Sequence, residues 1–365
     1  MKKLFSKTLI TGSLTVAGKC LLFLIAFIFV VFISLSTVEA QNLEETLNNL
    51  SEAAGRSYVA PLVTGFGSNL NGGWFHRAPA PKIFGLDFEL GIVAMGTFLS
   101  DEDRTFSTSG LFRFNRDQAT ILAAGVPELA RADVINAIIQ QDFEVGISGP
   151  TAIGAEDENV EIAFGGAFIL GYNIPAEVIE LTEVTGLMED LDILPLAAPQ
   201  ASIGTLFGTQ LTFRYLPGIE INEEIGEINY FGYGVQHNPE IWLGNLLPFN
   251  IAAGFFTQTL EIGEYVKATT TSFGINASKQ LGPGFLNLTP YAGYMFESSN
   301  LEFTYDYNID TPAGPSTQSI HFDMDGENKN RVTLGLSLKL GLFNINADYN
   351  TGKVNSVTAG LMMGF

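Results

Sequence analysis

The sequence predicts an all-β fold, an antiparallel transmembrane β-barrel of about ten strands within a range of roughly 8 to 14. Segments of about ten residues alternate between apolar and polar side chains, as strands do when one face meets lipid and the other water. Short turns on one side alternate with mostly longer, acidic loops on the other. After residue 40 no apolar run approaches the roughly 20 residues of a membrane-spanning helix.

The first forty residues have the composition of a secretory signal peptide. A lysine-rich head precedes the uncharged apolar run 21–35, and the small-residue exit 38–40 follows it. The run is short for a membrane span, so we predict removal of residues 1–40. The single cysteine, Cys20, is removed with them, and the mature chain then offers neither a disulfide nor a thiol site.

The chain is strongly acidic. It has 18 Lys and Arg residues against 39 Asp and Glu residues, a formal net charge of −21. Removal of residues 1–40 makes the mature chain more negative still, because that segment holds four lysines and one glutamate. A surface of this sign repels nucleic acid, so no nucleic-acid partner is predicted.

Residues 41–81 are predicted to form a short helical N-terminal arm or plug. Leucines recur at helical spacing between 43 and 50, and Gly55 is the expected helix stop. The Gly- and Asn-rich chain that follows is predicted to be irregular. Two interpretations stay open: an arm on the surface, or a lumen plug in which Trp74 and Phe75 pack against the inner wall.

The barrel domain, residues 82–365, begins with a strand predicted at 82–99. Alternate positions from Phe84 onward are apolar, whereas Asp87 and Glu89 fall on the opposite face. A watery lumen accepts these carboxylates and a dry core would penalise them.

Residues 100–160 are the least strand-like part of the chain and are predicted to be one elaborate loop or lumen insert. Within and after this segment we predict, in order, a strand at 105–114, helices at 117–124 and 127–140, a strand at 160–172 and an acidic amphipathic helix at 175–194.

Regular alternation returns from residue 201. The predicted strands are 202–216, 230–237, 249–260, 266–281, 286–296 and 331–343. A change of apolar parity between Glu297 and Asn300 is interpreted as a β-bulge, with a turn as the alternative. Residues 310–330 are predicted to be a long polar loop.

Aromatic residues near strand ends are interpreted as interfacial girdles; they are Tyr291, Phe343, Tyr349 and Phe365. On the segment 331–343, leucines occupy one face while Arg331 and Lys339 occupy the other. This pattern favours lipid outside and water inside.

The last strand, ending T-A-G-L-M-M-G-F, resembles the C-terminal signal of bacterial outer-membrane β-barrels. The matching positions are Thr358, Gly360, Met363 and Phe365. The resemblance implies location in the bacterial cell outer membrane, recognition of this strand by the barrel-assembly machinery, and outer-membrane lipid and lipopolysaccharide as neighbours.

Four phrases together resemble an uncharacterised family of outer-membrane barrels of Bacteroidota-type bacteria; they are Leu70–Trp74, Ser148–Gly154, Phe213–Pro217 and Gly234–Phe249. More distantly the chain is similar to FadL-type long-chain fatty-acid transporters, whose N-terminal segment plugs the lumen. It lacks their Asn-Pro-Ala plug phrase and is shorter than those fourteen-stranded proteins. The resemblance implies a hydrophobic solute as cargo, and it carries over no functional residue.

No set of residues predicts catalysis or a cofactor. A nucleophilic site would need Ser, His and an orienting group together, and His237 with Ser202 or Asn238 is the one candidate. Asn238 precedes a proline at an expected strand end, so a non-enzymatic protein is predicted.

The segment 321–328 holds the weak metal candidates Asp323, Asp325 and Glu327. It lacks the spacing and terminal bidentate glutamate of an EF-hand, so a solvated acidic loop without metal is favoured.

Two functions remain. The first is a passive channel or transporter for hydrophobic or small solutes, with residues 41–81 as a gate. The second is a structural or surface-interaction barrel without an open pore. About ten strands favour a narrow interior, since open aqueous pores come with roughly 16–18 strands.

Overall fold

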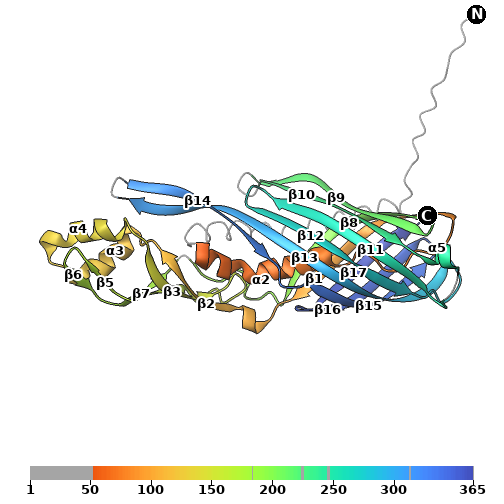
Figure 1. Cartoon of the computed structure of the whole chain (residues 1–365), viewed down its shortest axis with the longest axis horizontal. Helices are drawn as coiled ribbons and strands as arrows, with labels where there is room; N and C mark the ends of the chain where they lie inside the picture. Colours follow the sequence, from red (N-terminus) through yellow and green to blue (C-terminus); the bar gives the residue numbers. More distant parts are fainter. Residues whose placement is uncertain (1–51, 183, 223–225, 245–246, 312–313, 365) are drawn as a thin grey trace, which may run out of the picture.

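The computed structural model describes residues 52–365 apart from 183, 223–225, 245–246, 312–313 and 365. The predicted signal peptide, residues 41–51 of the predicted arm, and Phe365 lie outside the described residues. The described chain forms an elongated molecule, with a barrel at one end and a smaller unit at the other (Figure 1).

Ten antiparallel strands form a closed barrel, which confirms the predicted fold class. They are β1 (Phe84–Phe98), β8 (Ile193–Leu206), β9 (Thr209–Asn222), β10 (Gly226–His237), β11 (Asn250–Ile262), β12 (Val266–Ser278), β13 (Leu286–Thr311), β15 (Asn330–Leu340), β16 (Phe343–Thr351) and β17 (Ser356–Gly364). The first strand pairs with both β8 and β17, and β12 with β13 completes the circle.

The two ends of the barrel differ. At the turn end the strands are joined by 207–208, 238–249, 279–285 and 341–342, and the helix α5 (Glu240–Leu243) lies there with residue Gly364. Short turns occur at the opposite end as well, among them 263–265 and 352–355. At the domain end the chain between β1 and β8 and the long β13 extend far beyond the barrel (Figure 1).

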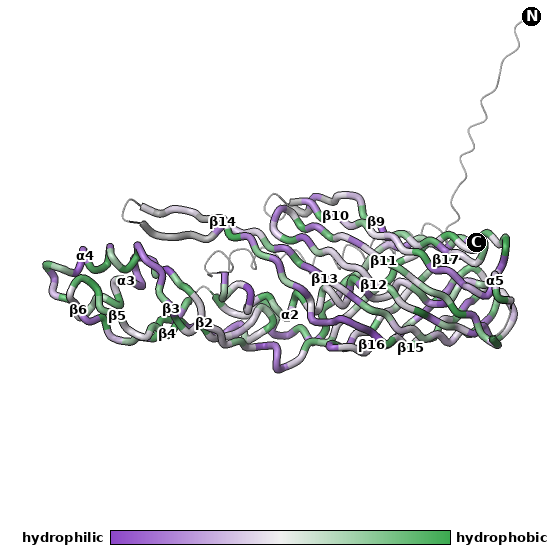
Figure 2. The backbone as a smooth tube through the Cα atoms, viewed as in Figure 1, coloured by the Kyte–Doolittle hydropathy of each residue, from purple (hydrophilic) through white to green (hydrophobic). Residues whose placement is uncertain are grey.

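The barrel wall has an apolar outside and a polar inside. Along β17, Ser356 and Thr358 are buried inside while Val357 and Ala359 turn outward, and leucines 334 and 336 on β15 are 62% and 53% exposed. Hydrophobic and hydrophilic positions alternate along the barrel strands (Figure 2). Exposed leucines on a closed barrel have no protein partner, so the exterior fits hydrocarbon. Among the described residues no helix is long and apolar enough to cross a membrane.

Leu336→Arg is expected to destabilise the barrel by about 2–4 kcal/mol, the cost of a cation on the lipid face near mid-membrane. Ser298→Arg, on the exposed outer face of β13 above Phe296, is the control, with about 0–1 kcal/mol expected near the interface. Urea unfolding in liposomes measures both. Equal losses of unfolding free energy in the two variants would contradict a hydrocarbon-covered exterior.

The predicted bulge in β13 is wrong. This strand pairs with β12 without interruption from Tyr291 to Phe303. The apolar parity changes because the inner environment changes: beyond the apolar band, Leu301, Phe303 and Tyr305 turn inward and join the buried core.

The predicted polar loop at 310–330 is also wrong over most of its length. The strand β14 (Gly314–Asp325) pairs with the outer half of β13 and extends it as a hairpin beyond the barrel. Phe322 of β14 is buried and stacks on Phe303 at 5.3 Å, so alternation also operates in this polar segment.

Residues 99–192, here called the outer domain, fold outside the barrel (Figure 1). Their buried apolar residues belong to one continuous core that also includes residues of α2 and of the outer half of β13. The elements of the outer domain are η1 (Asp101–Asp103), β2 (Thr105–Phe112), α3 (Arg116–Leu122), η2 (Ala123–Gly125), α4 (Glu128–Ile138), β3 (Phe143–Pro150), β4 (Val160–Phe164), β5 (Ala167–Ile169), β6 (Tyr172–Ile174) and β7 (Glu177–Leu181). The predicted strand at 105–114 and both short helices match β2, α3 and α4. The sheet has the order β2-β3-β4-β7.

Three predicted elements in or near this domain are wrong. The single strand expected at 160–172 is divided among β4, β5 and the start of β6. The helix expected at 175–194 is instead β7 and the start of β8, because Ile179 and Leu181 are buried with period two. The single strand expected at 202–216 is two strands, joined by a turn in which Phe207 and Gly208 have φ of 49° and 68°.

The helix α2 (Glu52–Asn71) begins beside the outer domain, where the Ala152 N–H donates to the Tyr58 carbonyl, and runs into the barrel lumen, from which the chain continues to β1 (Figure 1). Gly55 does not stop the helix, and residues 65–71 are helical rather than irregular. Away from water an unpaired backbone group is costly, so a helix is favoured here. Gly65 and Gly67 are required for close packing, since a Cβ atom would lie 2.7 Å from Leu194 Cδ2 and 2.3 Å from Ser299 Oγ.

Candidate functional site

The candidate site is the lumen together with residues 52–83, here called the plug. In the domain half, Tyr58, Leu62 and Val63 of α2 are at most 3% exposed. They belong to the same buried cluster as Leu301 and Phe303 of β13. The plug is therefore held at this level by a dry apolar core rather than by solvated contacts.

Arg214 of β9 clamps the middle of the plug. Its side chain is fully buried and donates to the backbone carbonyls of Leu70 at 3.2 Å and Gly72 at 2.7 Å. It also donates to Gln200 Oε1 at 2.9 Å, and its guanidinium carbon lies 4.0 Å from the centre of the Trp74 ring. Among the described residues no carboxylate pairs with this arginine, so the plug backbone is a main source of its hydrogen-bond acceptors.

A buried ion pair holds the plug from the opposite wall. Arg331 Nε of β15 lies 2.7 Å from Glu297 Oε1 of β13, and both side chains are at most 3% exposed. The same guanidinium donates to the backbone carbonyl of Ser68 at 2.5 Å. Asn328 donates to the other Glu297 oxygen at 2.7 Å.

Trp74 and Phe75 lie against aromatic residues of the wall. Trp74 stacks on Phe256 at 5.2 Å, and Phe75 meets Tyr291 edge-on at 6.1 Å. Tyr291 is therefore buried inside and is not a residue of the interfacial girdle, which corrects its prediction; its hydroxyl donates to Asp348 Oδ2 at 2.8 Å. The other two described girdle candidates, Phe343 and Tyr349, are exposed on the outside.

Closer to the turn end than these aromatic residues, side chains of the plug contact two carboxylates of β1. Arg77 Nη2 lies 2.5 Å from Asp87 Oδ2 and 3.1 Å from Glu89 Oε1, while His76 Nε2 lies 3.3 Å from Glu89 Oε2. Glu89 is 1% exposed. The two carboxylates that the sequence placed in a watery lumen thus face Arg77 and His76 of the plug. Asn238 also donates to the carbonyl of Pro79 at 2.8 Å.

A polar cavity of about 360 Å³ remains at the turn end, between the last residues of the plug and the barrel wall. Amide and hydroxyl side chains of several strands line it, together with Arg77, Lys82 and Lys339.

The barrel wall is incompletely paired between β8 and β9. Their pairing extends from Leu206 only as far as Gln200, which pairs with Arg214. Toward the domain end, residues 193–199 of β8 pair with β1 alone. This unpaired edge, here called the β8–β9 seam, holds Pro195 and Pro199, and proline is tolerated at a sheet edge because it has no N–H to donate.

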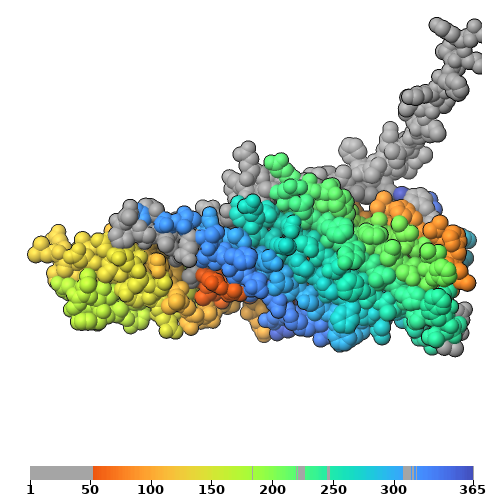
Figure 3. All heavy atoms as spheres, turned by 45° about the horizontal axis from the view of Figure 1, so that its top comes forward, coloured from red at the N-terminus to blue at the C-terminus, as the bar shows by residue number. Residues whose placement is uncertain are grey.

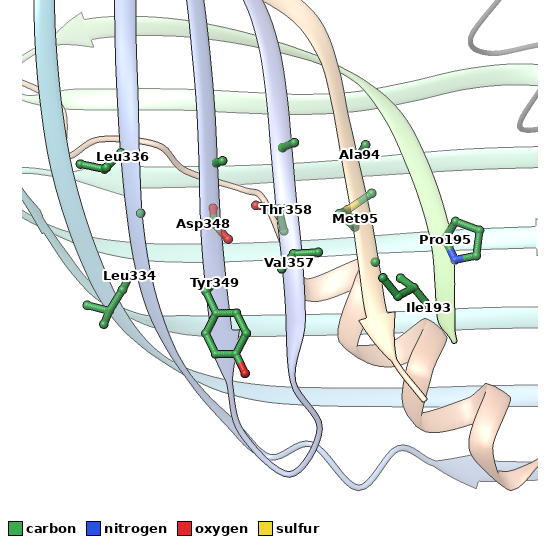
Figure 4. Close-up of a pocket in the computed structure, with 14 residues that line it drawn as sticks. Ala94, Met95, Ile193, Pro195, Leu334, Leu336, Asp348, Tyr349, Val357 and Thr358 are labelled. Carbon is green, nitrogen blue, oxygen red and sulfur yellow. The ribbon is translucent and has the colours of Figure 1, made fainter. Parts of the chain in front are cut away.

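The outside of the wall carries a hollow of about 750 Å³ across β15, β16, β17, β1 and β8 (Figure 4). Ala94, Ala347 and Ala359 lie in register across three neighbouring strands and form its shallow floor. Leu334 and Tyr349 border the floor on one side and Ile193 on the other.

The metal candidates have protein partners. Asn300 donates to Asp323 Oδ2 at 3.3 Å and to Asp325 Oδ1 at 3.1 Å, and Glu327 pairs with Lys353 at 3.2 Å. Within the described ranges no group of three or more His, Cys, Asp or Glu could hold a metal ion.

Near this segment, loss of hydration and the Glu327 carboxylate raise the pKa of Asp103 above its ordinary value.

The residues considered for a nucleophilic site, His237 with Ser202 or Asn238, make hydrogen bonds to other residues instead of to one another. His237 Nδ1 lies 2.9 Å from Thr209 Oγ1, and Trp242 donates to His237 Nε2 at 3.1 Å. Ser202 instead donates to Glu89.

Of the C-terminal signal, Thr358 and Gly360 face the lumen and Met363 turns outward, while Phe365 lies outside the described residues. The strand that carries them is central to the wall, paired with β1 and β16.

Sequence reasoning missed the residues that fasten the plug, above all Arg214, Glu297 and Arg331. Each is a charged residue at an inward strand position, which was the available signal. It was not decisive, because a water-filled lumen accepts the same residues.

Comparison with known proteins gave a family and distant structural likenesses. A family described as "Family of unknown function (DUF6588)" matches residues 18–365, and no curated protein matches the chain. Among solved structures, a loop-deletion mutant of OmpT, an outer membrane protein of Vibrio cholerae, is 12% identical, covers 78% of this chain and 100% of its own, and has a TM-score of 0.24. The transport unit of the autotransporter AIDA-I from Escherichia coli is 9% identical, with 83% and 98% coverage and a TM-score of 0.22.

Salmonella typhi OmpF, solved in complex with daunomycin, is 8% identical, with 77% and 97% coverage and a TM-score of 0.17. The assignment of the barrel rests on the strand pairing of this chain and not on these likenesses.

Proposed function

The chain belongs to the family of unknown function DUF6588, and we propose that it is an outer-membrane β-barrel, closed along its axis, that presents the outer domain at the bacterial surface. In this orientation the turn end faces the periplasm, and the two large extensions, the outer domain and the β13–β14 hairpin, face outward, because outer-membrane barrels carry their long loops on the outer side. Its neighbours are outer-membrane lipid and lipopolysaccharide, and the barrel-assembly machinery acts on β17. The protein is not an enzyme.

One observation carries the proposal: the plug is fastened to the wall at every level of the lumen. Apolar packing, the Arg214 clamp, the Glu297–Arg331 pair and the Arg77 pairs act on successive parts of one segment. A passive channel needs a continuous water path, which this arrangement opposes. The outer domain, with its own sheet beyond the barrel, supports a role outside the cell. Its space-filling surface continues that of the barrel as one long body (Figure 3).

The topology test uses single cysteines, because the predicted mature chain has none. Leu129→Cys in the outer domain, at a fully exposed position, is expected to react with a membrane-impermeant maleimide on intact cells. Lys279→Cys at the turn end is the control and should react only after lysis. Labelling of residue 279 but not 129 in intact cells would reverse the orientation and refute the proposal.

The closure test is planar-bilayer conductance of the full-length protein. We expect the current to stay at baseline, because the plug leaves no water path along the axis. A steady open level in the unmodified protein would refute axial closure and restore the channel hypothesis for small solutes.

The β8–β9 seam favours a second candidate, lateral exchange of hydrophobic molecules with the membrane. The inward residues at the seam, Leu194, Leu196 and Ala198, are apolar and belong to or pack against the core. A hydrophobic solute entering from lipid would meet no charged side chain among these three. This is the route on which a FadL-like role would depend.

A reversible cross-link tests this route. In a continued register Ala198 would face Leu216, so Ala198→Cys with Leu216→Cys would lock the seam when oxidised. Uptake of a fluorescent long-chain fatty acid should then fall at least tenfold and return on reduction. The control pair Ala347→Cys and Ala359→Cys joins strands that are already paired and should leave uptake unchanged. Unaltered uptake in the locked protein would exclude the seam.

A further inference from the structure

The polar cavity at the turn end, here called the vestibule, has more hydrogen-bond donors than its own residues use. Its floor is the plug segment 77–82, and its walls come from strands on several sides of the barrel. Of the side chains that line it only Asp87 is acidic, and Asp87 is paired with Arg77. Lys82 and Lys339 also line it, and within the described chain neither lies within ion-pair distance of a carboxylate, although Lys339 attracts the Glu89 carboxylate at longer range.

Two buried amides add to this excess. Asn344 is 4% exposed, and its Oδ1 accepts from Ser337 at 2.9 Å and from Asn346 at 3.4 Å. Its amide nitrogen can therefore only donate, and no acceptor for it is found among the described residues. Gln210 is 6% exposed, lines the same cavity, and likewise has no side-chain partner in the described part of the chain.

The volume of the vestibule and the charge of its lining indicate which class of ligand it could bind. At about 360 Å³ the vestibule lies at the small end of ligand pockets, which are roughly 300–1,000 Å³. Two unpaired ammonium groups favour an anion, and convergent amide donors favour further oxygen atoms on the same molecule. An apolar solute would instead leave these buried donors unsatisfied.

We propose that the vestibule binds a small anionic, oxygen-rich molecule, a carboxylated sugar or a phosphate, that enters at the turn end. Lys82 and Lys339 pair with the anionic group, and Asn344 and Gln210 donate hydrogen bonds to its other oxygens. The plug residue Lys82 and the wall residue Lys339 then contact one ligand, so binding joins the plug to the barrel. The site itself does not depend on the surface role proposed above.

Titration calorimetry of the full-length protein in detergent tests the site with three probes. Galacturonate represents the carboxylated sugar, inorganic phosphate the phosphate, and neutral galactose serves as the uncharged comparison. We expect saturable binding of one or both anions, at least tenfold tighter than galactose. Whether galacturonate or phosphate binds more tightly identifies which source the vestibule prefers.

The variant pair makes the test specific. Lys82→Gln with Lys339→Gln should weaken binding of the preferred anion at least tenfold, and Asn344→Ala should weaken it severalfold. Lys279→Gln, at the same end but outside the lining, is the control and should change binding less than twofold. Retained heat-modifiability on gels verifies the fold of each variant. Absence of saturation up to about 10 mM for both anions, or equal loss in the Lys279 control, would overturn the proposal while leaving surface labelling at residue 129 unaffected.

Discussion

Arg214→Met is expected to loosen the plug and to lower the free energy of unfolding by about 3 kcal/mol or more, because buried acceptors left without donors cost about 1–3 kcal/mol each. Methionine retains the volume and part of the packing on Trp74 but donates nothing to the carbonyls of Leu70 and Gly72. Gln258, which also donates to the Leu70 carbonyl, remains and limits the loss there. Brief conductance events should accompany the lower stability, since the clamp acts at the middle of the lumen.

Urea unfolding in liposomes and single-channel recording measure the two effects on the same preparation. Lys267→Met is the control: its pair with Glu261 spans 3.8 Å with both side chains nearly half exposed, so about 0–0.5 kcal/mol is expected. The loss of unfolding free energy in Arg214→Lys should lie between those of Arg214→Met and Lys267→Met, because one ammonium group cannot reproduce the planar fork that reaches two carbonyls and Gln200. Wild-type stability and silent bilayers for the methionine variant would show that the clamp does not hold the plug.

The barrel was predictable because lipid imposes one rule along each membrane-spanning strand. On β15 every second residue must be apolar, and the exposed leucines at 334 and 336 follow this rule. The rule ends where the membrane band ends. Leu301 and Phe303 lie on the inward face of β13 because a helix, not water, fills the space there, and period-two counting alone reads that inversion as a bulge.

The contents of the lumen were less predictable for a physical reason. Water and a polar plug accept the same inward side chains, so Glu89 is compatible with either. Gly67 and Gly73 did carry information: Gly73 has a φ of 68°, and a Cβ there would lie 2.4 Å from Val93 Cγ1. Glycine also occurs in loops, and only the three-dimensional contacts distinguish the two uses.

Arg331→Met is expected to cost about 3–5 kcal/mol, because it leaves the Glu297 carboxylate buried without a counter-charge. Glu297 would retain only the Asn328 donor, and Ser68 of the plug would lose its contact as well. Glu297→Gln with Arg331→Met removes both charges together. The double variant should therefore be more stable than Arg331→Met alone, with the remaining loss reporting the Ser68 contact.

A double-mutant cycle in urea separates these terms, with coupling of at least about 1 kcal/mol expected for residues in direct contact. The single variant Ser68→Ala removes only the weaker hydroxyl contact at 3.2 Å and serves as the matched control on the plug side. If the losses of unfolding free energy in Glu297→Gln and Arg331→Met add up to the loss in the double variant, the pair contributes no mutual stabilisation. The plug is then held from this wall by packing instead. A large coupling means that Arg331 cannot leave Glu297 without exposing a buried charge, so this wall resists plug movement through the pair itself.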